Sequence, residues 1–114
     1  NAMLTGKQKR YLRSLGHDLK PVITIGKSEI TETLLRETDT ALNHHELIKV
    51  KLLESCLLER QEAAEQLAGN LNAEITQILG RTLLLYRKSP ESRINLPESG
   101  KQPSTKTELP GPTR

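Results

Sequence analysis

The sequence is short of aromatic residues and of cysteine, and each shortage excludes a class of protein. Tyr11 and Tyr86 are its two aromatic residues, with no Phe or Trp among the 114 residues. The core must therefore be filled by Leu, Ile, Val and Ala, and the aromatic platform on which many single-strand nucleic-acid binders stack bases is missing. Cys56 is the one cysteine, so an intramolecular disulfide and a cysteine metal cluster are excluded, which favours a reducing, cytoplasmic location.

A long apolar run is also lacking. No stretch approaches the roughly 18 consecutive apolar residues of a membrane span, and no signal peptide is visible. We therefore expect no membrane partner. A chain of 114 residues has room for one domain, since domains usually run to about 100–150 residues.

The two ends of the chain differ from its body. Asn1-Ala2 ahead of Met3 is interpreted as a cloning remnant before the native start, so residues 1–3 are excluded from the fold. Residues 98–114 contain Pro, Gly, Ser and Thr without periodicity, which is typical of a disordered tail. The predicted domain is therefore 4–97, with Arg93–Pro97 laid against the body.

Charge is distributed unevenly along the chain. The formal net charge is +3, from 17 Lys and Arg against 14 Asp and Glu. Residues 1–27 hold six cations against the single acid Asp18, whereas residues 28–48 hold five acids against the single cation Arg36. One end is therefore positive and the middle is negative.

Capping residues and helical periodicity predict three helices. Thr5 and Gln8 have the spacing of a capping box, and Gly16 is placed to end this first helix. A second helix is expected from an N-cap at Thr31 to about His44-His45. The third is expected over about Leu57–Leu71, and Gly69-Asn70 would supply its stop.

Four strand-like runs separate or follow these helices. Val22–Ile25 is short and β-branched. Glu46–Leu53 alternates Ile48, Val50 and Leu52 with two lysines, which indicates a strand with one dry and one basic face. Glu74–Leu79 and Thr82–Tyr86 flank Gly80-Arg81, the pattern of a tight hairpin. The order α-β-α-β-α-β-β predicts a compact two-layer α/β fold with a mixed four-stranded sheet.

The stretch VITIGKSEIT, residues 22–31, sets a glycine, a lysine and a serine between a predicted strand and a predicted helix. A nucleotide-binding P-loop needs G-x-x-x-x-G-K-[ST], and the place of its first glycine is taken by Pro21. We therefore reject ATP or GTP hydrolysis. The favoured alternative is a loop whose Gly26 and Lys27 approach a phosphodiester chain, with the N–H groups of the next helix start nearby.

Three segments in order carry a resemblance to a known family. They are IGKSEIT after a Pro-led strand, ALNHHELIKVKL across the second helix and strand, and the hairpin ILGRTLLLYR with its basic exit. Together they resemble the CRM-domain family, the chloroplast RNA splicing and ribosome maturation domain, in its short bacterial stand-alone, YhbY-like form. The resemblance covers about residues 4–97. It implies a fold similar to the C-terminal domain of bacterial translation initiation factor three, RNA binding, and association with rRNA in precursors of the large ribosomal subunit.

The family's G-x-x-G loop falls on Gly26, Lys27, Ser28 and Glu29, so the first glycine is kept and the second is replaced by an acidic residue. Two consequences stay open. Either the loop binds phosphate through Gly26, Lys27 and nearby N–H groups, or phosphate contact shifts to other basic surfaces.

The candidate RNA-binding residues are basic or belong to this loop. They are Lys9, Arg10, Arg13, Lys20, Gly26, Lys27, Ser28, Lys49, Lys51, Arg81, Arg87 and Lys88. The competing interpretation is a solvated basic surface or an edge strand guarded by charge. A metal, a cofactor, a small-molecule substrate and catalysis are not expected, because His17, His44 and His45 lack companions at ligand spacing.

We therefore expect a non-enzymatic, monomeric RNA-binding module that recognises the phosphate backbone and shape of rRNA in large-subunit precursors. The alternative is a protein-interaction module that docks on a ribosomal protein or an assembly GTPase through the acidic second and third helices. DNA binding is a weaker third option, because nothing resembles a helix-turn-helix pair.

Overall fold

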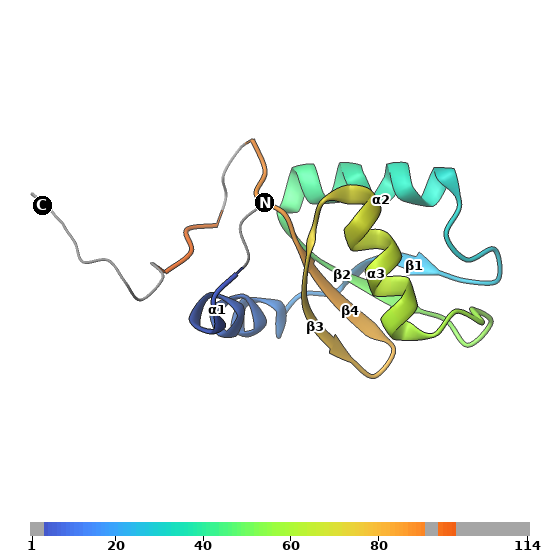
Figure 1. The fold of residues 1–114 in the computed structure, drawn as a ribbon, viewed down its shortest axis with the longest axis horizontal. Coiled ribbons are helices and arrows are strands. Elements are labelled where there is room, and N and C mark those ends of the chain that lie inside the picture. Colours follow the sequence, from blue (N-terminus) through green and yellow to red (C-terminus); the bar gives the residue numbers. More distant parts are fainter. Residues whose placement is uncertain (1–3, 91–93, 98–114) are drawn as a thin grey trace, which may run out of the picture.

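The computed structural model describes residues 4–90 and 94–97. The predicted remnant at 1–3, the predicted tail at 98–114, and Arg93 lie outside these ranges. The elements follow in the order α1 (Gly6–Gly16), β1 (Pro21–Ile25), α2 (Glu32–His45), β2 (Leu47–Leu52), α3 (Arg60–Leu71), β3 (Glu74–Leu79) and β4 (Thr82–Tyr86) (Figure 1). The predicted element order and α/β class are confirmed.

The strands form one mixed sheet in the order β1-β2-β4-β3. β1 and β2 pair in parallel, as the α2 crossover between them requires, and the two remaining pairings are antiparallel. Gly80-Arg81 joins β3 to β4 as the predicted hairpin, with Gly80 at φ +59°. β4 therefore lies in the interior of the sheet, and all but its first residue, Thr82, are buried.

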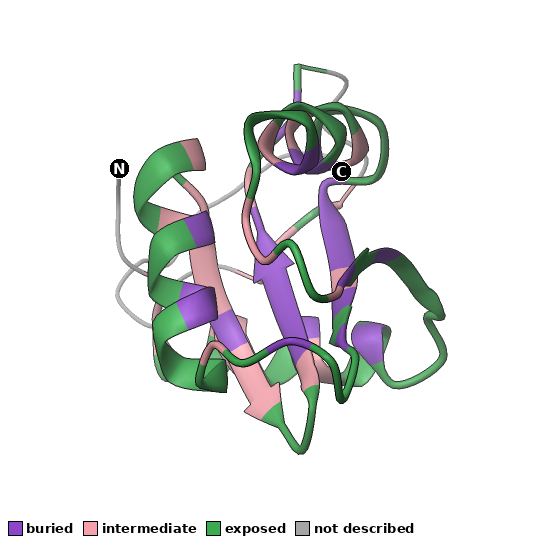
Figure 2. Cartoon of the chain, turned by 90° about the vertical axis from the view of Figure 1, so that its right-hand side faces the viewer, coloured by how far each residue is buried: buried purple, intermediate pink, exposed green. Residues whose placement is uncertain are grey.

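One face of the sheet packs against α2 and α3 to form the main core. Side chains that alternate along β2 and β4 point into it: Ile48, Val50, Leu52, Leu83 and Leu85. Leu34 and Leu42 of α2, and Ala63, Ala64 and Leu67 of α3, meet them there. In Figure 2, burial is concentrated on the strands and on the inward sides of the helices, while the connecting loops are mostly exposed.

α1 lies on the opposite face of the sheet and covers part of it. Leu12 packs with Leu47, Leu84 and Tyr86, which alternate with the core residues of β2 and β4. A Cβ at Gly16 would lie 2.8 Å from two methyl carbons of Leu84, so glycine permits the close approach of α1 to the sheet. α1 thus adds a partial layer to the two layers formed by the sheet with α2 and α3.

The segment 94–97 packs beside α1. Ile94 and Leu96 join the same apolar cluster. The side-chain amide of Gln8 donates to the carbonyl of Pro97 at 3.0 Å. These contacts attach the segment to the face of the sheet that α1 covers.

Helix ends follow the predicted caps in two cases and differ in the third. Thr5 forms a complete capping box with Gln8, and the Thr31 side chain accepts from the N–H of Leu34 at 3.1 Å. The predicted end of α3 at Leu71 is confirmed, but the helix begins at Arg60 rather than at Leu57, and it continues through Gly69-Asn70, the predicted stop. It ends where Asn72 adopts φ +59°, a left-handed conformation that asparagine tolerates better than most residues.

Candidate nucleic-acid interface

The loop after β1 forms a tight turn that exposes its two central residues. The N–H of Glu29 donates to the carbonyl of Gly26 at 2.9 Å, and Lys27 and Ser28 between them are exposed. Glu29 has φ +59°, in the left-handed region that favours glycine. The backbone therefore keeps a shape suited to a second glycine, although the side chain there is glutamate.

Three connections meet at this end of the sheet. The N–H of Leu53 donates to the carbonyl of Ile25 at 2.9 Å, which holds the loop after β2 beside the loop after β1. Figure 1 shows both loops projecting from the same end of the molecule. Arg81, in the hairpin turn, donates to the carbonyl of Leu53 at 3.1 Å. The structure thus gathers Lys27 and Arg81, which are far apart in sequence, at one end.

The sheet surface that α2 and α3 do not cover carries three rows of side chains across β2, β4 and β3. The first row is Leu47, Tyr86 and Glu74, where Leu12 of α1 packs. Register partners define the other two rows as Lys49, Leu84 and Gln77, and as Lys51, Thr82 and Leu79. We refer to these six residues as the open face. It contains two lysines and no acidic residue. Lys20 precedes Pro21, the register partner of Lys49, so this cation also lies at the border of the open face.

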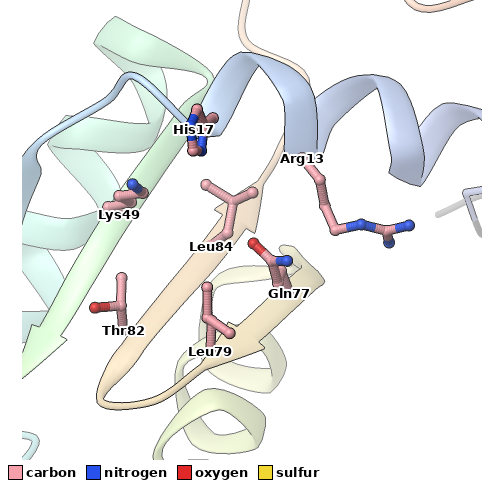
Figure 3. A pocket seen from close by; sticks show the side chains of 8 residues that line it. Arg13, His17, Lys49, Gln77, Leu79, Thr82 and Leu84 are labelled. Carbon is pink, nitrogen blue, oxygen red and sulfur yellow. The ribbon is translucent and has the colours of Figure 1, made fainter.

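Basic residues of α1 border the open face. Lys9 and Arg13 are one turn apart and half-buried against the sheet side of the helix, and His17 continues their row. Arg10 is exposed on another side of α1. A cavity of about 190 Å³ lies where this row reaches the sheet, between the end of α1 and Lys49, Gln77, Thr82 and Leu84 (Figure 3).

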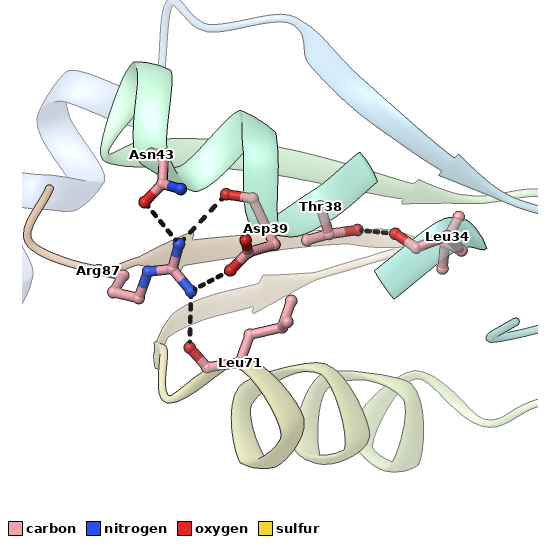
Figure 4. Close-up of polar contacts among 6 residues, drawn as sticks. All are labelled: Leu34, Thr38, Asp39, Asn43, Leu71 and Arg87. Atoms are coloured by element: carbon pink, nitrogen blue, oxygen red, sulfur yellow. Dashed lines mark hydrogen bonds and ion pairs between the residues drawn. The ribbon is translucent and has the colours of Figure 1, made fainter. Parts of the chain in front are cut away.

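Arg87 lies apart from the other predicted residues and joins α2, α3 and the end of β4. It donates to Asp39 Oδ1 at 2.8 Å, to the Asp39 carbonyl at 3.1 Å, to Asn43 Oδ1 at 3.0 Å and to the Leu71 carbonyl at 2.9 Å (Figure 4). Its side chain follows Leu83 and Leu85 in the alternation of β4, so it points away from the open face. We assign Arg87 a structural role. Lys88 is exposed beside it, far from the Gly26 loop.

The cations of α1 and of the open face form no ion pair with the residues that the structure describes. Arg87 and Asp39 form the one ion pair found in residues 4–90 and 94–97. Lys9, Arg13, Lys49 and Lys51 therefore have no carboxylate partner in that part of the chain. Cations held in this way are available to an anionic ligand.

Sequence reasoning missed a buried polar junction behind α1. Glu46 is 0% exposed, and its carboxylate accepts from the Tyr86 hydroxyl at 3.1 Å and from the N–H of Ile94 at 3.0 Å. Burial and the hydrogen bond to Glu46 raise the pKa of Tyr86 to about 12. Glu46 has φ +70°, an unfavourable conformation for glutamate at a helix end, where glycine is usual. This strained backbone indicates that the Glu46 side chain is held in one specific position.

The described residues contain neither a cluster of metal-ligating side chains nor a helix that could span a membrane. Among residues 4–90 and 94–97, no group of three or more His, Cys, Asp and Glu side chains is arranged to hold a metal ion. No helix in the same ranges combines the length and apolarity needed to cross a membrane.

Comparison with known proteins gives a consistent match. Residues 4–87 match the model of the CRS1 / YhbY (CRM) domain. The chain is 40% identical over 96 residues to the Bacillus subtilis protein named "Probable RNA-binding protein YqeI", a match that covers 83% of this chain and 100% of that protein. It is 42% identical over 94 residues to a Haemophilus influenzae protein named "RNA-binding protein", covering 82% and 95% of the two chains.

A solved structure matches the fold as well. The solution structure of a hypothetical protein from Staphylococcus aureus superposes with a TM-score of 0.72 at 44% sequence identity. The match covers 83% of this chain and 100% of that one. The similarity thus extends over nearly the whole body of the domain.

Proposed function

This chain belongs to the CRS1 / YhbY (CRM) domain family, and from that premise we propose that it is a non-enzymatic RNA-binding protein. Its RNA is structured rRNA in precursors of the large ribosomal subunit, as the resemblance of its motifs implies. It acts there as an assembly factor by holding an rRNA conformation during maturation. Relatives named as RNA-binding proteins support the general part of this proposal.

The observation that carries the proposal is the basic surface formed by α1 and the open face, whose cations have no ion-pair partner in residues 4–90 and 94–97. Lys9 and Arg13 of α1, and Lys49 and Lys51 of β2, come from two separate segments and line one side of the sheet. Phosphate contacts of this kind dominate RNA affinity and are largely independent of sequence. The shortage of aromatic residues fits recognition of backbone and shape rather than base stacking.

The proposed interface extends from α1 to the loop end of the sheet. Its members are basic or belong to the turn after β1: Lys9, Arg10, Arg13, Lys20, Gly26, Lys27, Ser28, Lys49, Lys51 and Arg81. Arg87 is left out because its donors bind α2 and α3. Lys88 is left out because it lies at the opposite end of β4.

A second candidate function rests on the opposite side of the molecule. The outward sides of α2 and α3 expose Glu32, Glu37, Glu62 and Glu65. This acidic surface suits a basic protein partner, such as a ribosomal protein or an assembly GTPase. It lies across the sheet from the proposed RNA interface, so both functions are compatible in one particle.

Sedimentation of the host lysate in sucrose gradients tests the proposal. The protein is expected to travel with large-subunit precursors at low salt and to be released by high salt or RNase. Association that survives both treatments would instead support protein docking through α2 and α3. Sedimentation at the top of the gradient at low salt would contradict ribosomal association.

A further inference from the structure

The cavity on the open face is formed because α1 ends directly above it. Leu84 is 2% exposed and makes its floor, and Gly16 touches Leu84 closely enough to close one side. The chain leaves the helix at His17, so no further turn of α1 covers the sheet beyond this contact. Space of about 190 Å³ is left between the helix end and the strands.

The walls of this cavity combine apolar and hydrogen-bonding groups. Gln77 of β3 and Thr82 of β4 flank Leu84 on the same face, and Figure 3 shows their side chains beside it. The Gln77 amide can both donate and accept, as can the Thr82 hydroxyl. Leu79, at 68% exposure, extends the apolar surface at the rim.

Cations lie at the edges of the cavity. Lys49 is the register partner of Leu84 on β2, and Arg13 extends outward from the last turns of α1 (Figure 3). Lys49 and Arg13 are therefore placed to contact an anion outside the cavity while a neutral group occupies the cavity itself. A nucleotide combines these two parts, since its base is an apolar ring with polar edges and a phosphate lies on either side.

We propose that this cavity takes a single unpaired base of the RNA, extruded from a loop or a bulge, while Lys49 and Arg13 contact the adjacent phosphates. This inference rests on the proposed RNA binding and adds to it the class of nucleotide recognised. The cavity is smaller than the roughly 300 Å³ at which pockets for drug-sized ligands begin, which suits one ring system. A base within a duplex cannot reach it, since its faces are stacked and its edges paired.

The test compares RNA hairpins that differ by one nucleotide. One hairpin is fully paired, and four others carry a single bulged A, C, G or U at the same position. Affinities of the full chain are measured at fixed salt for the wild type, Gln77→Leu and Thr82→Val. Both substitutions keep side-chain size and remove hydrogen-bonding groups, and thermal unfolding verifies that each variant is folded. Lys9→Ala, which removes a phosphate contact away from the cavity, is the matched control.

The wild type is expected to bind at least one bulged hairpin roughly tenfold more tightly than the paired hairpin, which corresponds to about 1.4 kcal/mol. Gln77→Leu and Thr82→Val should lose most of this preference while binding the paired hairpin as before. Lys9→Ala should weaken all hairpins equally.

Failure of the base cavity and failure of RNA binding give different results in this experiment. Equal, salt-sensitive binding of every hairpin by the wild type would overturn the base cavity and leave RNA binding in place. A preference for bulges that survives in both cavity variants would also overturn it. Failure to bind any hairpin at low salt would overturn both the cavity and the proposed function.

Discussion

The Tyr86 hydroxyl donates a hydrogen bond of 3.1 Å to the carboxylate of Glu46, and both side chains are buried. The same carboxylate accepts from the N–H of Ile94 at 3.0 Å. One acidic side chain therefore joins the residue before β2, the end of β4 and the segment that packs beside α1. This junction supports the side of the sheet on which the proposed interface lies.

Ionisation of Tyr86 is expected to destabilise the fold at high pH. Its pKa is raised from 10.0 to about 12 in the folded protein, so the folded state binds the phenol proton more tightly than the unfolded state. This contribution to the free energy of unfolding is fully present below pH 10 and is lost as pH rises towards 12. Absorbance titration of the Tyr11→Phe variant, in which Tyr86 is the one remaining tyrosine, should show tyrosinate near pH 12. Its appearance near pH 10 in the folded protein would contradict the junction.

Arg87 is expected to stabilise the protein without contributing to RNA affinity. Arg87→Met removes the hydrogen bonds to Asp39, Asn43 and Leu71. The free energy of unfolding should fall by about 2–3 kcal/mol, since charged hydrogen bonds that join separate elements are lost. Urea unfolding measures this, and Lys88→Ala, at the exposed neighbour, should stay within about 0.5 kcal/mol of the wild type. A loss of RNA affinity specific to folded Arg87→Met would contradict the structural assignment.

Glu29 is expected to weaken both stability and binding at the loop. Glu29→Gly relieves a left-handed backbone at φ +59° and should raise the free energy of unfolding by about 1 kcal/mol. It also removes a negative charge next to Lys27, so RNA affinity should rise. Glu29→Gln removes the same charge and keeps the strained backbone. Glu29→Gln should therefore raise RNA affinity without raising the free energy of unfolding. Equal stability of the two variants would show that the backbone is not strained.

Most of the fold follows from local sequence signals, and the departures arise from packing that those signals do not contain. The capping residues Thr5 and Thr31 and the hairpin at Gly80-Arg81 are visible in sequence because each acts within a few residues. Gly69-Asn70 does not stop α3, because Gly69 lies on an exposed side of the helix, where nothing forces the chain to end it. The left-handed Asn72 ends it instead.

The candidate site, too, could be predicted from the sequence only where the signal is local. Alternation along β2 placed Lys49 and Lys51 on one face, which the register confirms. Sequence did not separate Arg87 from the other cations, because its partners on α2 and α3 are distant in the chain. Nor did it indicate the cavity, which depends on α1 crossing the face opposite α2 and α3.

The central claim is that RNA binds the face of the sheet that carries Lys49 and Lys51. Its most direct test is the salt dependence of affinity for one structured RNA, compared between Lys51→Ala on that face and Arg36→Ala on α2. Both residues are exposed, and each substitution removes one positive charge. Lys51→Ala is expected to lower affinity and to reduce the slope of log K against log salt by about 1, the loss of one phosphate contact. Arg36→Ala should change neither. Equal effects of the two variants would show that net charge alone governs binding and would contradict the interface.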